Sequence, residues 1–195
     1  MGRYIDEDEL KAYGNSTTVS DRNDYRTAIL AAETQIDIDC QRSFDVASGT
    51  PSSLSFRSRS PGLCVLDIRD CVSVTSVTEN GALLVENVDY VLEPIAGEQW
   101  SGEVRPYDRI VRTSGSWYYD GPIPTVVVVA DWGWAAQPLG LKEVAKVAAK
   151  AHLDGRNLSL GLAAVVESGG VRQSEALTVR KFIDGYHSIH AVGIA

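Results

Sequence analysis

The sequence predicts an α+β protein: N-terminal helices and a helix in the C-terminal part form a helical bundle, a small antiparallel β domain is inserted between them, and an extended arm follows. Two patterns support this fold class. Apolar residues recur at helical spacing in the first 45 residues and again after Pro138, whereas β-branched runs broken by turn residues fill positions 53 to 134. A chain of 195 residues that is 44% hydrophobic can also bury a core.

The N-terminal helical part, residues 1–52, is predicted to hold two helices. Asp6 can cap a short helix that ends near Gly14, because the acidic side chains of its first turn are stabilised by the positive end of the helix dipole. Apolar residues in steps of 4, 3, 4 and 4 then predict one longer amphipathic helix. The stripe consists of Tyr25, Ile29, Ala32, Ile36 and Cys40.

The β domain is predicted over residues 53–137. Asn80-Gly81 is its best hairpin signal, because both residues accept the positive φ angles of a tight turn. Residues 125–130 are apolar on both faces apart from Thr125, which predicts a central strand buried on both sides. The strands are expected at 54–58, 63–68, 72–78, 90–92, 109–113 and 125–132, with long edge loops at 93–107 and 114–124.

The C-terminal part begins with a helix over residues 138–155 that completes the predicted bundle. Its alanines give it a face that allows close packing against other helices. The remaining residues, 156–195, are predicted to be a loop and an arm that is ordered by a partner, although 174–182 could form a short helix or strand.

The net charge of -8 is unevenly distributed along the chain. Residues 1–137 hold 11 basic and 21 acidic side chains, and residues 138–195 hold 7 and 5. This acid excess argues against a protein that binds nucleic acids by neutralising phosphates. The charged N-terminal decapeptide and the lack of a long apolar run predict a protein made in the cytoplasm that has no membrane partner.

Catalytic motifs are missing from the sequence. There is no nucleophile elbow, phosphate-binding loop or zinc-protease motif, and the pair His187 and His190 is too short a signal for a metal. Three cysteines without close pairing are expected to be mostly buried. We therefore expect no enzymatic activity, no metal and no cofactor.

Several motifs occur in an order that resembles the head-tail connector (adaptor, head completion) proteins of long-tailed bacteriophages. The resemblance covers roughly residues 4–155 and extends to Gly170-Val171-Arg172 and Ser174-Glu175. The motifs that carry it are YIDEDEL at 4–10, a helix over 28–42 followed by Phe44, VTSV at 74–77, DYVLEP at 89–94, and VVVVA at 126–130 leading into Trp132-Gly133-Trp134 and Pro138.

The resemblance implies a non-enzymatic virion protein of the neck. Such proteins form a ring, commonly of twelve copies, that docks under the portal protein and offers a platform for the next neck or tail-completion protein. Double-stranded DNA passes through the ring during genome ejection without specific binding. The acid excess suits that passage, because an acidic subunit repeats its charge around the lumen and repels phosphate.

Three groups of residues are candidates for these roles. The acidic residues expected near the lumen are Asp6, Glu7, Asp8, Glu9, Glu33, Asp37 and Asp39. The residues expected at a subunit or domain interface are Trp132, Trp134, Ala145 and Ala148. The candidates for a portal-binding arm are Val171, Arg172, Arg180, Lys181, Phe182 and Tyr186.

Two other function classes remain open. A carbohydrate- or host-binding β module is the main alternative, because Trp117-Tyr118-Tyr119 could present aromatic faces to a sugar. An enzyme is the second, and it would need a dispersed carboxylate site that one sequence does not reveal.

Overall fold

A computed structural model of the chain describes residues 3–14, 22–94, 99–100, 103–153 and 173–187. The chain divides into two compact units. The helical unit is formed by residues 1–43 together with 138–195, and the β unit by residues 44–137.

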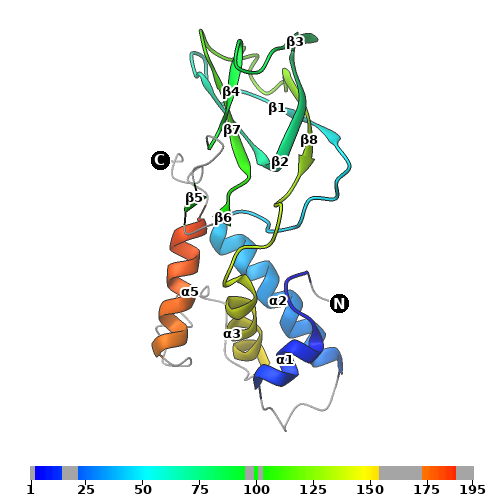
Figure 1. The fold of residues 1–195 in the computed structure, drawn as a ribbon, viewed down its shortest axis with the longest axis vertical. Helices are drawn as coiled ribbons and strands as arrows, with labels where there is room; N and C mark the ends of the chain where they lie inside the picture. The colour runs from blue at the N-terminus through cyan, green and yellow to red at the C-terminus, as the bar shows by residue number, and fades with distance from the viewer. Residues whose placement is uncertain (1–2, 15–21, 95–98, 101–102, 154–172, 188–195) are drawn as a thin grey trace. The chain divides into compact units, whose positions relative to one another are not determined.

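The helical unit contains four described helices (Figure 1). The helix α3 contacts each of the other three, and α2 also contacts α1 and α5. None of the helices in the described part of the chain is long and apolar enough to cross a membrane. The helices are α1 (Glu7–Gly14), α2 (Arg22–Cys40), α3 (Leu141–Leu153) and α5 (Gln173–Tyr186).

The predicted cap and stripe of the N-terminal helices are confirmed. The Asp6 carboxylate accepts a hydrogen bond from the backbone N–H of Glu9, 2.8 Å away, and the Glu9 carboxylate accepts one from the N–H of Asp6 at 3.0 Å. This reciprocal pair is a capping box, which satisfies two N–H groups that the helix itself cannot. All five residues of the α2 stripe, from Tyr25 to Cys40, are buried.

The β unit is built around one six-stranded antiparallel sheet (Figure 1). The strand order is β1-β8-β2-β7-β4, and β3 pairs with the far end of β2. A separate two-stranded sheet is formed by β5 and β6. The strands are β1 (Ser52–Phe56), β2 (Val65–Glu79), β3 (Ala82–Leu84), β4 (Tyr90–Glu93), β5 (Gln99–Trp100), β6 (Glu103–Val104), β7 (Tyr107–Arg112) and β8 (Val126–Trp132).

The strand β2 organises the sheet. It runs for 15 residues and pairs with β3, β7 and β8. Two register shifts against β8, one between Cys71 and Ser73 and one between Val74 and Ser76, let this long strand bend. Its last residues enter the predicted hairpin, in which Asn80 and Gly81 have φ angles of 49° and 81°. The Asn-Gly prediction is therefore confirmed.

The predicted fold class was wrong in its balance between helices and strands. Strands dominate the core through a six-stranded sheet, and the helices do not form the predicted bundle. The predicted strands were too short. The sequence pattern predicted two strands within 63–78, whereas the structure has one continuous strand, β2, that supports a larger sheet. The β unit is thus not a small insertion.

The predicted extended arm was also wrong over the residues that the structure describes, whereas the alternative of a short helix over 174–182 is confirmed. Residues 173–186 form α5, with Val179 and Phe182 buried on one side. Phe182 lies close to Gly140, just before α3, where an added Cβ would meet the Phe182 ring at 3.7 Å. Burial of these two side chains stabilises the helix, so α5 belongs to the core of the helical unit.

Two burial predictions were wrong as well. The strand β8 is not buried on both faces, because its residues alternate and Val127 is 38% exposed. Such alternation is typical of an antiparallel sheet with one solvated face. Among the cysteines, Cys40 and Cys71 are buried as expected, whereas Cys64 is exposed.

Candidate functional site

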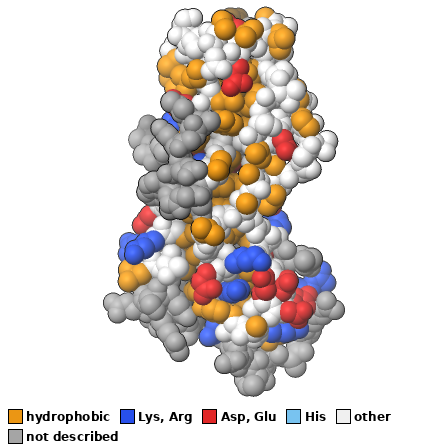
Figure 2. All heavy atoms as spheres, viewed as in Figure 1, with side chains coloured by type: hydrophobic (Ala, Val, Ile, Leu, Met, Phe, Trp, Pro, Cys, Tyr) orange, Lys and Arg blue, Asp and Glu red, His pale blue; other side chains and the backbone are white. Residues whose placement is uncertain are grey.

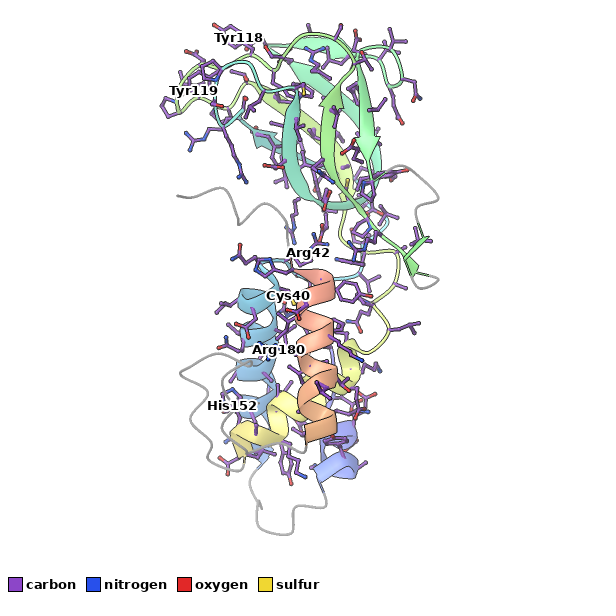
Figure 3. All side chains as sticks on the ribbon, turned by 90° about the vertical axis from the view of Figure 1, so that its left-hand side faces the viewer. Cys40, Arg42, Tyr118, Tyr119, His152 and Arg180 are labelled. Atoms are coloured by element: carbon purple, nitrogen blue, oxygen red, sulfur yellow. The ribbon has the colours of Figure 1, made fainter. Side chains whose placement is uncertain are left out.

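Exposed apolar side chains collect at the end of the β unit that carries β3 (Figure 2). They come from β3, from the turn after it and from the loop between β7 and β8. Tyr118 and Tyr119 lie on the outside of the unit (Figure 3). We call this surface the apolar end; it consists of Leu83, Val85, Val88, Tyr118, Tyr119 and Ile123, with exposed fractions between 40% and 68%.

The turn after β3 is fixed by one carboxylate. The Asp89 side chain accepts a hydrogen bond from the N–H of Val85 at 2.8 Å, and the Asp89 N–H donates to the Val85 carbonyl at 2.8 Å. Asn87 supports the turn with a positive φ of 63°. These contacts leave Val85 and Val88 pointing outward on a constrained backbone.

The loop that carries the two tyrosines is anchored by a polar network. The Glu79 carboxylate, at the end of β2, accepts a hydrogen bond from the N–H of Tyr118 at 2.8 Å and also pairs with the Arg112 guanidinium. That guanidinium lies over the ring of Trp117, 4.7 Å from its centre. Trp117 itself is buried, and its backbone N–H donates to the Leu63 carbonyl at 2.9 Å.

Backbone contacts join the separate segments of the apolar end. The Asn80 N–H donates to the Thr125 carbonyl at 2.9 Å, and the Thr125 hydroxyl donates to the Tyr118 carbonyl at 3.1 Å. The Thr113 N–H, just after β7, donates to the Asp89 carbonyl at 3.1 Å and joins this segment to the turn after β3. The six apolar side chains are therefore held on a framework of hydrogen bonds that reaches across both loops.

The chemistry of the apolar end suits contact with another macromolecule. Soluble proteins seldom leave contiguous apolar side chains exposed unless they form an interaction site. Glu86 and Asp120 are exposed beside these side chains and give the surface an acidic border. Tyrosines add contact area at low entropic cost, because each has only two side-chain torsions.

The predicted lumen residues differ widely in their surroundings. Glu33 is only 1% exposed, so it offers no charge to a lumen; its carboxylate accepts the Tyr4 N–H at 2.7 Å. Asp37 is bound to the Arg3 guanidinium at 2.6 Å and to the Tyr4 hydroxyl at 2.5 Å. These two carboxylates hold the N-terminal segment on α2.

The other acidic candidates are mostly paired too. Asp6 and Glu9 form the capping box, and Glu9 also accepts a hydrogen bond from Lys142 at 2.8 Å. Glu7 lies 4.0 Å from Arg26. Asp8 is the one candidate with a nearly fully exposed side chain, 96%, and Asp39 accepts a hydrogen bond from Gln35 at 2.8 Å.

The predicted interface residues lie largely inside the units. Trp134 is buried against Phe44, with ring centres 5.4 Å apart, and its indole N–H donates to Asp70 at 3.1 Å. Trp132 is partly buried against Phe56, and its indole N–H donates to the Ser52 carbonyl at 2.8 Å. Ala145 and Ala148 are buried within the helical unit.

The predicted arm residues fall into two groups. Arg180 and Lys181 are exposed on α5, and Phe182 is buried there. The Phe182 ring lies 4.6 Å from that of Tyr186. Val171 and Arg172 lie outside the described residues.

The titratable side chains that the structure describes can be compared with the requirements of a metal site and of a reactive thiol or imidazole. They include no group of three His, Cys, Asp or Glu that could hold a metal ion. Burial lowers the pKa of His152 and raises the pKa of Cys40 and Cys71 to about 12, so the imidazole is neutral and the two thiols are protonated near neutral pH. His187 follows α5, and His190 lies outside the described residues.

Sequence reasoning missed most of the apolar end. The sequence indicated Tyr118 and Tyr119 as candidate surface aromatic residues. It did not indicate Leu83, Val85 and Val88, because a hairpin rich in apolar residues has the same pattern as a strand in a buried sheet. The one available signal is the short distance between the Asn-Gly turn and these residues, since residues beside a tight turn are seldom buried. Glu79 was missed because its partners are distant in the chain.

Comparison with known protein families and with curated proteins found no match for this chain.

Proposed function

We propose that this chain is a structural head-to-tail adaptor of a tailed bacteriophage. Copies of it form a ring, of about twelve subunits in related connectors, that docks under the portal protein of a virion whose subunits are made in the host cytoplasm. The next neck or tail-completion protein binds the ring, and double-stranded DNA passes through it. The proposal rests on the order of the motifs in residues 4–155.

The apolar end is the structural observation that carries the proposal. An adaptor must offer a preformed surface to a neighbouring protein, and the network around Glu79 and Asp89 holds six apolar side chains ready for such contact. A surface held in place before binding loses less entropy on association. A sugar-binding module is less well supported, because Trp117, the largest ring of the aromatic cluster, is buried.

The charge distribution also supports passage of DNA. The β unit contains 12 acidic and 6 basic residues, so it carries most of the negative charge of the chain. Repetition of this charge around a ring opposes binding of phosphates. Asp8 has an exposed side chain that can face a lumen, whereas Glu33 is buried and cannot.

The test is binding to the portal protein and to the neck or tail-completion protein encoded in the same genome. The unmodified chain should bind both in co-sedimentation and form a ring visible by electron microscopy. A double variant of the apolar end, Leu83→Asp with Val88→Asp, should lose one of the two partners and keep its fold. Val104→Asp is the matched control, because Val104 is equally exposed but lies on β6. Failure of the unmodified chain to bind either protein would disprove the function.

A further inference from the structure

One side of the sheet carries a row of uncharged residues that begins at the apolar end. Leu83 on β3 lies opposite Thr78 on β2, and Thr78 lies opposite Val127 on β8. Val127 lies opposite Ser55 on β1, so the row crosses four neighbouring strands (Figure 1). Residues directly opposite in an antiparallel sheet point to the same face, with Cβ atoms about 5 Å apart. The row is therefore continuous, and Leu83 belongs both to it and to the apolar end.

A second row runs beside the first on the same side of the sheet. Each of its residues lies two positions from a member of the first row along the same strand, so its side chain points the same way. This side faces away from the core, because the intervening Val77 and Val128 are fully buried. We call the two rows the uncharged face; it consists of Ser53, Ser55, Ser76, Thr78, Leu83, Val127 and Val129, each at least partly exposed.

The other half of the sheet offers a comparison within the same unit. Asp67 on β2 lies opposite Arg109 on β7, and Arg109 lies opposite Glu93 on β4. The Arg109 guanidinium lies 3.6 Å from the Glu93 carboxylate, and Asp67 lies 3.1 Å from Arg59. Such polar side chains are typical of a sheet face that is covered by water. The uncharged face has none of them, and depletion of charge is typical of the centre of a protein interface.

The border of the apolar end limits which surface can cover it. Residues 80–90 and 113–125 include three carboxylates, Glu86, Asp89 and Asp120, and no Lys or Arg. Asp89 holds the turn after β3, whereas Glu86 and Asp120 are exposed. A second copy that offered this same surface would bring like charges together. A partner with Lys or Arg at its border would instead be attracted.

We propose that one partner protein covers the apolar end and the uncharged face together. Its contact surface has an apolar, uncharged centre and Lys or Arg side chains where it meets Glu86 and Asp120. Because Leu83 belongs to both parts, a partner seated on the apolar end continues across β2 and β8 to the edge strand β1. This inference rests on the proposed function, which requires such a partner.

Cysteine probes test the extent of the contact. The background variant is Cys64→Ser, because Cys64 is exposed whereas Cys40 and Cys71 are buried. Ser55→Cys places a probe on β1, at the end of the uncharged face away from the apolar end. Val104→Cys places a control probe on β6. A thiol reagent is applied to the chain alone, and to the chain bound to the portal protein or to the neck or tail-completion protein from the same genome.

The Ser55→Cys probe should react rapidly in the chain alone. The relevant complex is the one with the partner that Leu83→Asp with Val88→Asp loses. In this complex the probe should react about tenfold more slowly when the partner is present at about ten times its Kd. Val104→Cys should react at the same rate in both samples.

A charge reversal tests the border. Glu86→Lys should slow association with the same partner, and the difference from the unmodified chain should shrink as salt screens the charges. Asp24→Lys is the matched control, because Asp24 is exposed on α2 and the change in net charge is the same. Association of this control should equal that of the unmodified chain.

Four results would overturn the inference. Protection of Ser55→Cys in the chain alone would assign the face to another segment of this chain or to a second copy. A fully reactive Ser55→Cys in the complex would limit the contact to the apolar end. Unchanged association of Glu86→Lys would remove the basic border, and binding of both partners by Leu83→Asp with Val88→Asp would remove the docking site.

The unmodified chain separates these failures from failure of the proposed function. If it binds both the portal protein and the neck or tail-completion protein, the proposed function stands and only the extent or chemistry of this contact is wrong. If it binds neither, both are wrong.

Discussion

The Glu79 carboxylate at the end of β2 accepts a hydrogen bond from the backbone N–H of Tyr118, 2.8 Å away and 39 residues later in the chain. The same carboxylate pairs with Arg112 on β7. One side chain therefore joins two strands to the loop that presents Tyr118 and Tyr119. This contact explains how a loop rich in Gly, Pro and Ser can present a defined surface.

Replacement of Glu79 by Ala should loosen this loop. The change removes the acceptor of the Tyr118 N–H, leaves Arg112 without its counter-charge in a largely buried ion pair and costs about 3 kcal/mol. Hydrogen exchange at the Tyr118 amide should accelerate in the variant. Glu86→Ala is the control, because Glu86 is exposed beside the same surface and should leave this amide protected. Unchanged exchange in Glu79→Ala would show that the carboxylate does not hold the loop.

Gly133 should tolerate no side chain. Its φ is 121°, and an added Cβ would lie 2.5 Å from the carbonyl oxygen of Asp45 and 2.9 Å from the backbone nitrogen of Ala47. Gly133→Ala should therefore destabilise the β unit by about 3 kcal/mol or more in urea unfolding. Gly115→Ala is the control, since Gly115 also has a positive φ but has open space around it, and should cost only about 1–2 kcal/mol. Equal costs for the two variants would contradict the close approach at Gly133.

The capping box should stabilise α1. Asp6→Ala removes the acceptor for the Glu9 N–H and should reduce stability by about 1 kcal/mol, measured by thermal unfolding. Asp8→Ala is the control. Asp8 lies in the first turn of α1 and its side chain is almost fully exposed, so this variant should change stability by less than about 0.5 kcal/mol. An Asp8→Ala effect as large as that of Asp6→Ala would rule out the cap as the cause.

The pair of Glu9 and Lys142 should stabilise the helical unit only in the middle of the pH range. The Lys142 ammonium lowers the pKa of Glu9 below its usual 4.5, and Glu9 raises the pKa of Lys142 above its usual 10.5. The pair therefore stabilises the helical unit between these two pH values. This stabilisation is lost as the pH falls below about 4.5 or rises above about 10.5. The stability difference between the unmodified chain and Lys142→Met should be small at pH 7, because exposed pairs are worth little, and should shrink further as the pH falls below 4.5. A difference that does not change as the pH falls would assign the effect to packing.

Thiol reactivity should separate the three cysteines. Cys64 is exposed, whereas burial raises the pKa of both Cys40 and Cys71 to about 12. A thiol reagent should thus modify one equivalent rapidly in the folded protein and three after denaturation. Cys64→Ser should remove the rapid reaction, and a second rapid equivalent would contradict the burial of the other two.

Local patterns in the sequence were sufficient to predict many elements. The Asp6 cap, the buried stripe of α2 and the Asn80-Gly81 hairpin depend on residues close together in the chain, and all three are confirmed. Such features are determined by backbone preferences and by helical period.

Features that depend on distant contacts could not be predicted in the same way. The length of β2 was missed because Arg69 and Asp70 interrupt its apolar pattern, although Asp70 is buried and accepts a hydrogen bond from Trp134. The burial of Glu33 is likewise explained only by its contact with the Tyr4 N–H, 29 residues away. Without knowledge of its partner, a carboxylate is predicted to lie on the surface.

The same limit applies to the candidate site. Aromatic residues drew attention to Trp117, Tyr118 and Tyr119, but burial of the first and exposure of the other two follow from the Glu79 and Arg112 network. The sequence singled out both Lys181 and Phe182 as arm residues, but in α5 the first side chain is exposed and the second is buried. One is available to a partner and the other is part of the core.

The proposed function requires that several copies of this chain assemble on a portal. Native mass spectrometry of the unmodified chain mixed with the portal protein from the same genome tests it most directly, because the mass gives the number of bound copies. We expect one complex in which a fixed number of copies, about twelve, is bound to each portal ring. A portal that remains without bound copies at saturating concentrations of the chain would contradict it.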